Sequence, residues 1–437
     1  MATGTPRNPR RGATTAPGAF KVELSYPGKR PLSEILDTPS GTFSIVITGG
    51  KNKQLYFAEN LSALAALTAD KSVCGKVQLV YIDPPYATQT VFQSRKLTHA
   101  YEDVFETGEY VDFLRERLAF LHRLLAEDGS IYLHIDDKML FHAKLLLDEI
   151  FGEANYRNCI TRKKCNPKNY TRNMFGNVAD YILFYTKSDK YVWNRQVEPW
   201  TVERAKEYHY VEPETRRRFM KVPVHAPEVR NGDTGKPWRG MLPPPGKHWQ
   251  FTPTTLDELD ARGEIFWSKN GNPRRKVYLD QSAGVPVQDI WMDFRDAHNQ
   301  NIHITGYPTE KNIDLLKRII EASSNPGDIV LDCFAGSGTT LAAADMLGRN
   351  WIGIDNSPEA LRTMLHRFAH GTEPMGDFVG KKNTKEPAEP TLFDLIPGGE
   401  EEDSKTVYKV ELFSLLATPE TFLIARQIAE HLATETE

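Results

Sequence analysis

Two stretches of this chain alternate strand-like and helix-like patterns, and a long irregular stretch separates them. The first runs from about Gln54 to Ile150, with strand patterns at Val77 to Ile82 and Ile131 to Ile135 and helix patterns at Tyr110 to Leu125 and Lys138 to Ile150. The second runs from about Asn312 to His370, with a helix at 313–324, strands at Ile329 to Leu331 and Trp351 to Ile354, and a helix that begins at Thr340. Such alternation predicts an α/β fold with a mostly parallel sheet and helices on its faces.

The remaining segments differ from these two stretches in composition. Residues 157 to about 300 are rich in Pro, Arg, Tyr and Trp, and only Ala179 to Thr186 has a clear strand pattern. We therefore expect an α/β domain over 41–156 and 301–370, interrupted by a loop-rich domain over 157–300. Residues 1–40 are expected to form a disordered basic arm. Residues 371–437 are expected to form an acidic linker, then a strand at Val407 to Phe413 and a helix from Pro419 to Leu432.

Charge is segregated along the chain, although the formal net charge is only -4. Residues 157–250 carry 19 Lys and Arg against 9 Asp and Glu, whereas residues 371–437 carry 6 against 14. This balance argues against a uniformly basic coat protein, but it allows the middle segment to meet nucleic acid.

Cysteine usage and hydropathy limit the compartment and the metal chemistry. The 4 cysteines are scattered and have neither CxxC spacing nor a ligand-spaced histidine pair. This pattern argues against a disulfide framework and a zinc site, so we expect no metal and a reduced, cytoplasmic location. No apolar run reaches the roughly 18 residues of a membrane span, and no membrane association is expected.

A glycine-rich loop follows a strand of the second stretch and opens a helix. It reads Asp332-Cys333-Phe334-Ala335-Gly336-Ser337-Gly338-Thr339. Glycines at such a turn let a ligand approach the backbone, and Asp355 at the tip of the next strand can bind a ribose diol. The loop alone also fits a turn without a ligand, or a nicotinamide or flavin enzyme, although the dinucleotide fingerprint requires a third glycine that is missing here.

A second motif, Asp83-Pro84-Pro85-Tyr86, follows the apolar strand of the first stretch. The two prolines hold the chain extended and remove two backbone N–H donors, so this segment offers hydrogen-bond acceptors beside an aromatic ring. Such a site suits a planar base with an exocyclic amine, because the amine donates hydrogen bonds and the ring stacks. The alternatives are a surface turn or a ligand for a proline-binding module.

The order and content of these motifs resemble the beta class of amino-methylating DNA methyltransferases, in which the acceptor motif precedes the cofactor motif. The resemblance extends over about Gln54 to Ala360 and includes ADYILFYTKSD and GYPTEKNIDLLKRIIEASSNPGDIVLDCFAGSGTT. Within this class, the chain is most similar to adenine-N6 members related to type III modification subunits and to their solitary or phage relatives. The resemblance implies a Rossmann-like methyltransferase fold with circularly permuted motif order and an inserted target-recognition domain.

The resemblance also implies roles for individual residues. Asp83 and Pro84 would accept hydrogen bonds from the target amine, with Pro85 between them and Tyr86, which would stack on the extruded base. The residues that would contact S-adenosylmethionine are Glu59, Asn60, Tyr307, Pro308, Thr309, Lys311, Asp332, Phe334, Gly336, Gly338, Thr339 and Asp355. Glu59 replaces the family's usual Asp, which makes the contact to the cofactor adenine an open point. The second aromatic wall of the base pocket is also open, with Phe184 and Tyr185 as candidates.

Basic residues of the middle segment are the candidates for DNA contact. They are Arg162, Lys163, Lys164, Lys168, Arg172, Arg216, Arg217 and Arg218. Because aromatic residues such as Trp238 and Trp249 are interleaved with them, we expect this segment to contact phosphates and bases, the alternative being solvated loops. His134, Asp136 and Asp137 could be metal ligands, but a buried strand end followed by a helix cap is the favoured interpretation.

These observations together predict a site-specific methyltransferase that moves a methyl group from S-adenosylmethionine to N6 of a flipped adenine in double-stranded DNA. The alternatives are N4-cytosine methylation, a non-catalytic DNA-recognition subunit and a nicotinamide oxidoreductase. Carbon-5 cytosine methylation is disfavoured because the chain has no Pro-Cys dipeptide. A homodimer and a separate restriction subunit are both left open by the sequence.

Overall fold

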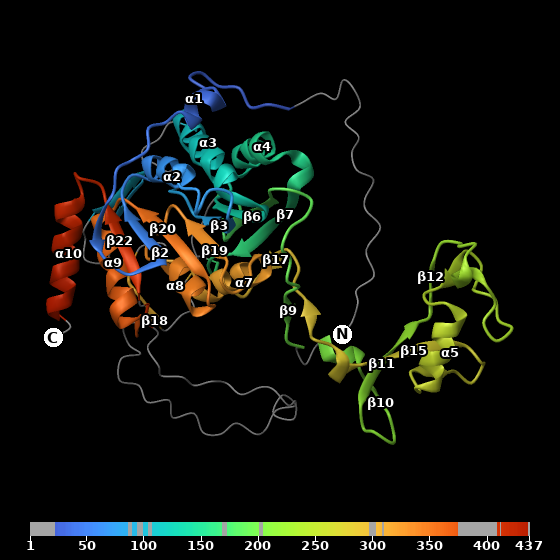
Figure 1. Cartoon of the computed structure of the whole chain (residues 1–437). Helices are drawn as coiled ribbons and strands as arrows, with labels where there is room; N and C mark the ends of the chain where they lie inside the picture. The colour runs from blue at the N-terminus through green and yellow to red at the C-terminus, as the bar shows by residue number, and fades with distance from the viewer. Residues whose placement is uncertain are drawn as a thin grey trace. The chain divides into compact units, whose positions relative to one another are not determined.

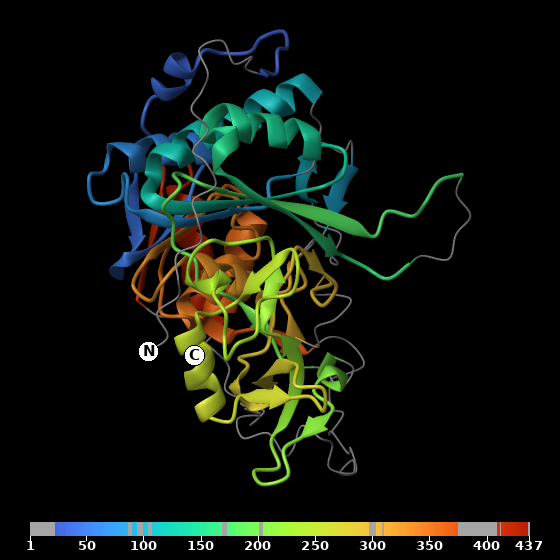
Figure 2. The same cartoon turned by 90° about the vertical axis from the view of Figure 1, so that its right-hand side faces the viewer.

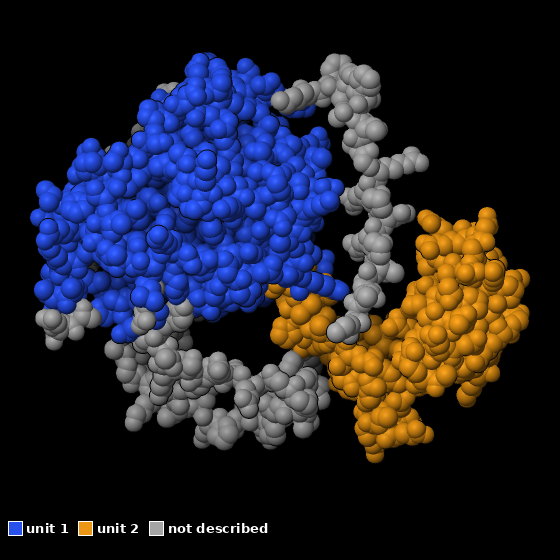
Figure 3. Space-filling model, viewed as in Figure 1, with its two compact units in different colours: residues 1–195, 288–385, 402–437 blue, residues 196–287, 386–401 orange. Residues whose placement is uncertain are grey.

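The computed structural model describes residues 22–85, 90–93, 99–103, 107–167, 173–200, 204–296, 303–307, 310–374, 409–410 and 412–435 (Figure 1). The chain divides into two compact units, coloured separately in Figure 3. The first consists of residues 1–195, 288–385 and 402–437, and the second of residues 196–287 and 386–401. None of the described helices combines the length and the apolarity needed to cross a membrane.

The first unit is built around a sheet that has ten strands within the described residues. Five neighbours run parallel, in the order β2 (Gly50–Phe57), β20 (Asn350–Asp355), β19 (Ile329–Asp332), β3 (Val77–Ile82) and β6 (Leu125–Ile135). Beyond β6 follow β8 (Ala179–Thr186), β7 (Tyr156–Lys163) and β17 (Ile290–Trp291), and beyond β2 follow β22 (Phe413–Ala417) and β1 (Ser44–Ile47). All six residues of β3 are buried, as expected for a central strand that is covered on both faces.

Helices cover the two faces of this sheet (Figures 1 and 2). α2 (Asn60–Ala69), α3 (Thr107–Leu124) and α4 (Leu140–Phe151) lie on one face, and α7 (Ile313–Ser323), α8 (Thr339–Met346) and α9 (Pro358–His370) lie on the other. α7 begins at Asn312, whose side chain accepts from the amide of Asp314, and α4 ends at Gly152, which has φ 85°. The predicted α/β fold with a mostly parallel sheet is confirmed.

The predicted disordered arm over 1–40 is wrong for its second half, while residues 1–21 lie outside the described residues. α1 (Leu32–Leu36) packs against α3, and Ile35 is fully buried. The Tyr26 hydroxyl donates to Asp112 at 2.8 Å, and the Lys29 ammonium pairs with Glu149 at 2.9 Å. These contacts to α3 and α4 order the segment, because composition does not reveal contacts that distant helices supply.

The inserted region is shorter than predicted. β8, β17 and all but the first residue of β7 fall within 157–300, yet these strands pair with the central sheet. The part of the second unit that lies within 157–300 runs only from Gln196 to Val287. The C-terminal strand also differs from its prediction. It lies at Phe413–Ala417, later than Val407 to Phe413, and it pairs with β2 and β1, followed by α10 (Phe422–Glu435). This segment completes the main sheet and is not a separate element.

The second unit contains short strands and one helix. An antiparallel sheet orders β10 (Tyr210–Val211), β11 (Arg218–Pro223), β15 (Pro273–Tyr278) and β14 (Ile265–Trp267). β12 (His225–Pro227) pairs with β13 (Lys247–Trp249), β9 (Val197–Glu198) pairs with β16 (Val285–Pro286), and α5 (Pro253–Ala261) packs beside β14. Trp238 and Trp249 are buried in the core of this unit, where the Trp238 indole donates to Asp257. They therefore hold the unit together, and the prediction that they contact bases is wrong.

Candidate functional site

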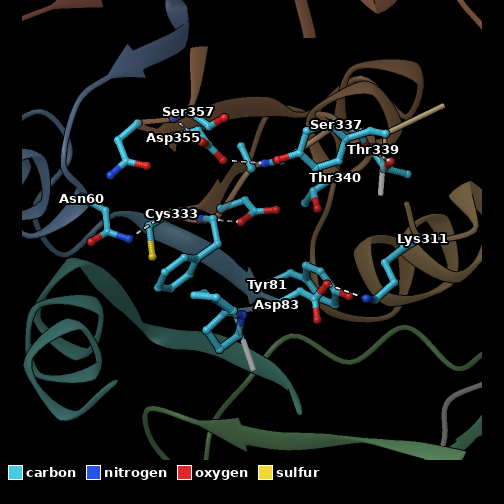
Figure 4. A pocket seen from close by; sticks show the side chains of 18 of the residues that line it. Asn60, Tyr81, Asp83, Lys311, Cys333, Ser337, Thr339, Thr340, Asp355 and Ser357 are labelled. Carbon is cyan, nitrogen blue, oxygen red and sulfur yellow. Dashed lines mark hydrogen bonds and ion pairs between the residues drawn. The ribbon is translucent and has the colours of Figure 1, made fainter. Parts of the chain in front are cut away.

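The acceptor and donor motifs lie at the same edge of the sheet, on neighbouring strands. β3 and β19 run parallel, and both motifs follow the carboxyl ends of these strands. The strand order diverges at this point, because the chain continues from β3 through α3 to β6 on one side and from β19 through α8 to β20 on the other. Ligands of open α/β sheets bind at such a point. A cavity of about 300 Å³ opens there, and Figure 4 shows side chains of both motifs around it.

Two carboxylates of the donor segment face this cavity. Asp332 ends β19, is 2% exposed and accepts from the amide of Phe334 at 2.9 Å. The pKa of Asp332 is raised to about 7, chiefly by burial and in part by the nearby carboxylates of Asp83 and Asp355. Asp355 ends β20 and accepts from the amides of Gly336 at 2.8 Å and Ser357 at 2.9 Å. Burial also raises the pKa of Asp355, and both carboxylates hold the donor loop in shape.

The two glycines of the donor loop have different surroundings. Gly336 lines the cavity, has φ +51°, and a Cβ added there would lie 3.4 Å from Tyr307. Gly338 has φ +72°, and an added Cβ would lie 2.8 Å from Cγ of Met364 on α9. Gly338 is absent from the described lining of the cavity. A Cβ on Gly338 would point toward α9, so a glycine is needed here for packing, and its contact with the cofactor stays a prediction.

The end of β2 forms another part of the wall. Glu59 lines the cavity, but its carboxylate caps α2 by accepting from Ser62 and pairs with Arg117 at 2.6 Å. Asn60 donates to the carbonyl of Cys333 and accepts from Arg117, both at 2.9 Å. The Arg117 guanidinium lies 3.7 Å from the centre of the Phe113 ring. Arg117 and Phe113 were missed by sequence reasoning, because only the approach of α3 to α2 brings them here.

The acceptor carboxylate is paired with a lysine. Asp83 and Lys311 form an ion pair of 2.5 Å, drawn as a dashed line in Figure 4. Lys311 was expected beside the methionine part of the cofactor, and its ammonium instead lies at the acceptor motif. Asp83, Pro84, Pro85, Tyr307 and Thr339 all line the cavity as predicted. Tyr86, Pro308 and Thr309 lie outside the described residues.

Arg162 was predicted to contact DNA, and the structure shows that this prediction is wrong. Its side chain is fully buried, pairs with Asp180 at 2.8 Å and with Asp296 at 2.7 Å, and donates to the carbonyl of Phe294. It therefore stabilises the region where β7 meets β8, and no surface is left for a phosphate. Lys163 and Lys164 follow it and are half-buried, while Lys168 and Arg172 lie outside the described residues.

The three consecutive arginines of the second unit also differ from one another in their contacts. Arg217 makes two hydrogen bonds to Asp280 at 2.7 and 2.8 Å and lies over the Tyr278 ring. Arg218 donates to the carbonyls of Tyr208 and Ala205. Only Arg216 of the three is exposed. Arg217 and Arg218, predicted to contact DNA, therefore hold the fold of the second unit, and Arg216 is the exposed candidate of the three.

His134 and Asp136, at the end of β6, make contacts that stabilise the fold. His134 is fully buried, with the Tyr81 hydroxyl 2.7 Å from Nδ1 and Asp180 2.9 Å from Nε2, and Asp136 accepts from the amide of Met139. No cluster of three or more potential metal ligands is found within the described ranges. Phe184 is buried between Tyr132 and Trp193, and Tyr185 donates to Asp148. Neither aromatic belongs to the described wall of the cavity.

Comparison with known proteins agrees with this arrangement. Residues 77–366 match the family described as DNA methylase. The type II methyltransferase M.EcaI of Enterobacter cloacae is 48% identical over 378 residues, which cover 85% of this chain and 82% of that protein. The DNA adenine methyltransferase YhdJ of Escherichia coli K12 is 27% identical over 73% of this chain and 84% of that protein. The Mod subunit of the type III restriction-modification enzyme StyLTI of Salmonella typhimurium is 27% identical over 65% of this chain and 48% of that protein.

The family match covers more than half of the chain, and it contains both motifs that meet at the cavity. The chain belongs to the DNA methylase family and is a DNA methyltransferase.

Proposed function

We propose that this methyltransferase acts on N6 of adenine, with Asp83 and Pro84 as the acceptors for the amine. The observation that carries this proposal is the shared cavity, in which the Asp83 motif and the Asp332 loop face one another from adjacent strands. The name of the relative YhdJ, a DNA adenine methyltransferase, supports adenine as the base.

The cavity suits S-adenosylmethionine, the methyl donor of this family. Of the described residues that line it, Glu59, Asp83, Glu310, Asp332 and Asp355 carry carboxyl groups, and Lys311 carries an ammonium. Arg117, Lys311 and Arg367 balance the charges of Glu59, Asp83 and Glu310, so the lining offers the cofactor hydrogen-bond acceptors and no large excess of negative charge. Asp355 would hold the ribose, and Gly336 would let the cofactor approach the backbone. When bound, S-adenosylmethionine supplies a methyl group on a positively charged sulfur.

The protein's own part in the reaction is to direct the amine. The lone pair of the adenine amine is delocalised into the ring, and acceptors for its two hydrogens at Asp83 and the Pro84 carbonyl would localise it toward the methyl group. A new N–C bond then forms as the S–C bond breaks, the sulfur becomes a neutral thioether, and the nitrogen releases one proton to solvent. Holding the two reactants in this orientation supplies much of the rate. Extruding the base first costs a few kcal/mol.

Product analysis tests this proposal. DNA methylated by the enzyme is digested to nucleosides and analysed by mass spectrometry. We expect N6-methyldeoxyadenosine from the wild type and no product from Asp83→Ala, which should still bind S-adenosylhomocysteine within about threefold of wild type, because Asp83 acts on the amine. N4-methyldeoxycytidine as the product would contradict the choice of base, and loss of cofactor binding in a folded Asp83→Ala would contradict the assignment of the motif.

We also infer that the second unit reads the target sequence and that a restriction activity belongs to a separate polypeptide. The basic charge of residues 157–250 supports DNA contact, and relatives include subunits named for restriction-modification enzymes. Exchanging residues 196–287 for those of a relative with a different target should change the methylated sequence, which sequencing of modified bases would detect. An unchanged target would contradict this role.

A further inference from the structure

The residues directly before and after Lys311 are both buried and fixed by polar contacts. Glu310, Lys311 and Asn312 are three consecutive buried polar residues, with exposures of 4%, 9% and 2%. Glu310 accepts from both the amide and the hydroxyl of Thr305, and it forms a buried ion pair with Arg367 of α9. Asn312 caps the start of α7. The contacts of Glu310 and Asn312 therefore fix the backbone of Lys311, independently of what its side chain contacts.

From this fixed position the Lys311 side chain reaches across to the acceptor strand. Its ammonium lies 2.5 Å from Oδ2 of Asp83, and the exposed fractions of the two side chains are only 9% and 19%. Figure 4 shows the pair at the end of the cavity that the acceptor motif forms. An ion pair in such a poorly hydrated place is stronger than one at the surface, and it fixes the direction of the carboxylate.

The neighbouring carboxylate shows what burial does to an acid in this cavity. Asp332 has a pKa raised to about 7, chiefly by loss of hydration and in part by Asp83 and Asp355. A protonated acid would donate a hydrogen bond from one of its oxygens, and it could not accept equally well from an amine. At the acceptor motif, by contrast, the Lys311 ammonium lies against the Asp83 carboxylate and directs its oxygens.

We propose that Lys311 is a positioning residue for methyl transfer, which holds the carboxylate of Asp83 in its orientation toward the target amine and does not primarily hold the cofactor. This inference rests on the proposed function, because it assumes that Asp83 accepts the hydrogens of the adenine amine. It differs from a cofactor-binding role of Lys311 in one measurable respect. A positioning residue affects the rate of the bound complex, whereas a cofactor contact affects the affinity for the cofactor.

The test compares Lys311→Met, which keeps the length of the side chain without its charge, with Lys311→Arg, which keeps the charge. We expect Lys311→Met to lower kcat about 100-fold, as expected for a misplaced reacting group. The KM for S-adenosylmethionine and the Kd for S-adenosylhomocysteine should stay within about threefold, and Lys311→Arg should recover at least about tenfold of the lost kcat. Lys317→Met, at a partly exposed lysine of α7, the helix that follows Lys311, is the matched control and should match wild type.

Two results would overturn the inference: a kcat within about threefold of wild type, or a cofactor affinity that falls more than about tenfold while kcat is kept. Lys311→Gln is measured in parallel, so that poor folding of Lys311→Met does not decide the outcome. A thermal-unfolding cycle with Asp83→Asn provides a second readout. Lys311→Met should lower Tm by about 3 °C or more in wild type and by less than half as much when Asp83 is already neutral. Equal shifts in both backgrounds would contradict the pairing.

Asp83→Ala separates this inference from the proposed function. If Asp83→Ala is inactive while Lys311→Met is fully active, only the role of Lys311 is wrong. If Asp83→Ala retains activity, the proposed function itself is wrong.

Discussion

Leu331 of β19 lies opposite Val80 of β3 in a parallel strand pair. One residue beyond Leu331 the chain reaches Asp332, and three residues beyond Val80 it reaches Asp83. The register of this pair therefore brings the first acid of the donor loop and the acid of the acceptor motif into one cavity. The electrostatic influence of Asp83 on Asp332 follows from this register.

The raised pKa of Asp332 predicts a pH-dependent stability. The ordinary value of 3.8 applies to the unfolded chain, so between about pH 4 and pH 7 the folded protein keeps a proton that the unfolded chain has released. Stability from this group is present at low pH and is lost as the pH rises through 7. Asp332→Asn removes the titration, and relative to this variant the cofactor-free wild type should lose up to a few kcal/mol between pH 5 and pH 8. Parallel curves of Tm against pH for the two proteins would contradict the assignment.

Gly338→Ala should destabilise the fold without abolishing cofactor binding in the protein that remains folded. The new Cβ would meet Met364 at 2.8 Å, and overpacking of this kind costs about 1 to 3 kcal/mol. Urea unfolding measures the loss, and titration with S-adenosylhomocysteine measures the binding.

Gly348→Ala is the matched control, since Gly348 also has φ +72° but offers only an ordinary contact of 3.9 Å to Pro326. It reports the cost of the backbone conformation alone, which should be smaller than the cost at Gly338. Equal losses at the two glycines would mean that α9 packing plays no part.

Arg162→Met should destabilise the protein by about 3 to 5 kcal/mol, because it leaves the buried Asp180 without the guanidinium and also removes the ion pair with the partly exposed Asp296. Arg162→Lys should restore little, since an ammonium cannot reproduce the contacts of the planar guanidinium to both acids and to the Phe294 carbonyl. Chemical denaturation is the measurement. A stability within 1 kcal/mol of wild type, together with weaker DNA binding, would return Arg162 to the DNA-contacting set.

The double variant Lys163→Gln, Lys164→Gln should weaken DNA binding and leave the stability of the protein unchanged. Both lysines are only half-buried, at the end of β7 that lies on the same edge of the sheet as the cavity. If they contact phosphates, DNA affinity should fall and the slope of log K against log salt should flatten by about 1 to 2, with stability unchanged. An unaltered salt slope would place the DNA elsewhere.

Arg216→Gln and Arg217→Gln should separate DNA contact from folding within the arginine triplet. Arg216 is exposed, and its neutralisation should reduce the salt slope by about 1. Arg217 pairs with Asp280 in a largely solvated position, so its loss should cost about 1 kcal/mol or less of stability and leave DNA affinity within about twofold. DNA titrations at several salt concentrations measure the first effect, and thermal unfolding of the full chain measures the second. Reversed results would mean that the Arg217 pair opens to meet DNA.

The sequence by itself determined the two α/β stretches and both motifs at the cavity. The apolar run at Val77 to Ile82 coincides with β3, and the glycine that ends α4 was recognisable from sequence. These features depend on local periodicity and backbone conformation, which neighbouring residues specify. Both motifs follow predicted strands of a parallel sheet, and parallel strands place their carboxyl ends at one edge.

Only the tertiary structure decided which charged residues are available for function. Arg162 and Arg217 have the same composition around them as Lys163 and Arg216, yet partners that are distant in sequence engage Arg162 and Arg217. In the same way, Lys311 pairs with Asp83, although more than half of the chain separates the two residues in sequence. The C-terminal segment forms β22 of the main sheet. Burial and ion pairing depend on what packs against a side chain, and a sequence pattern does not contain that information.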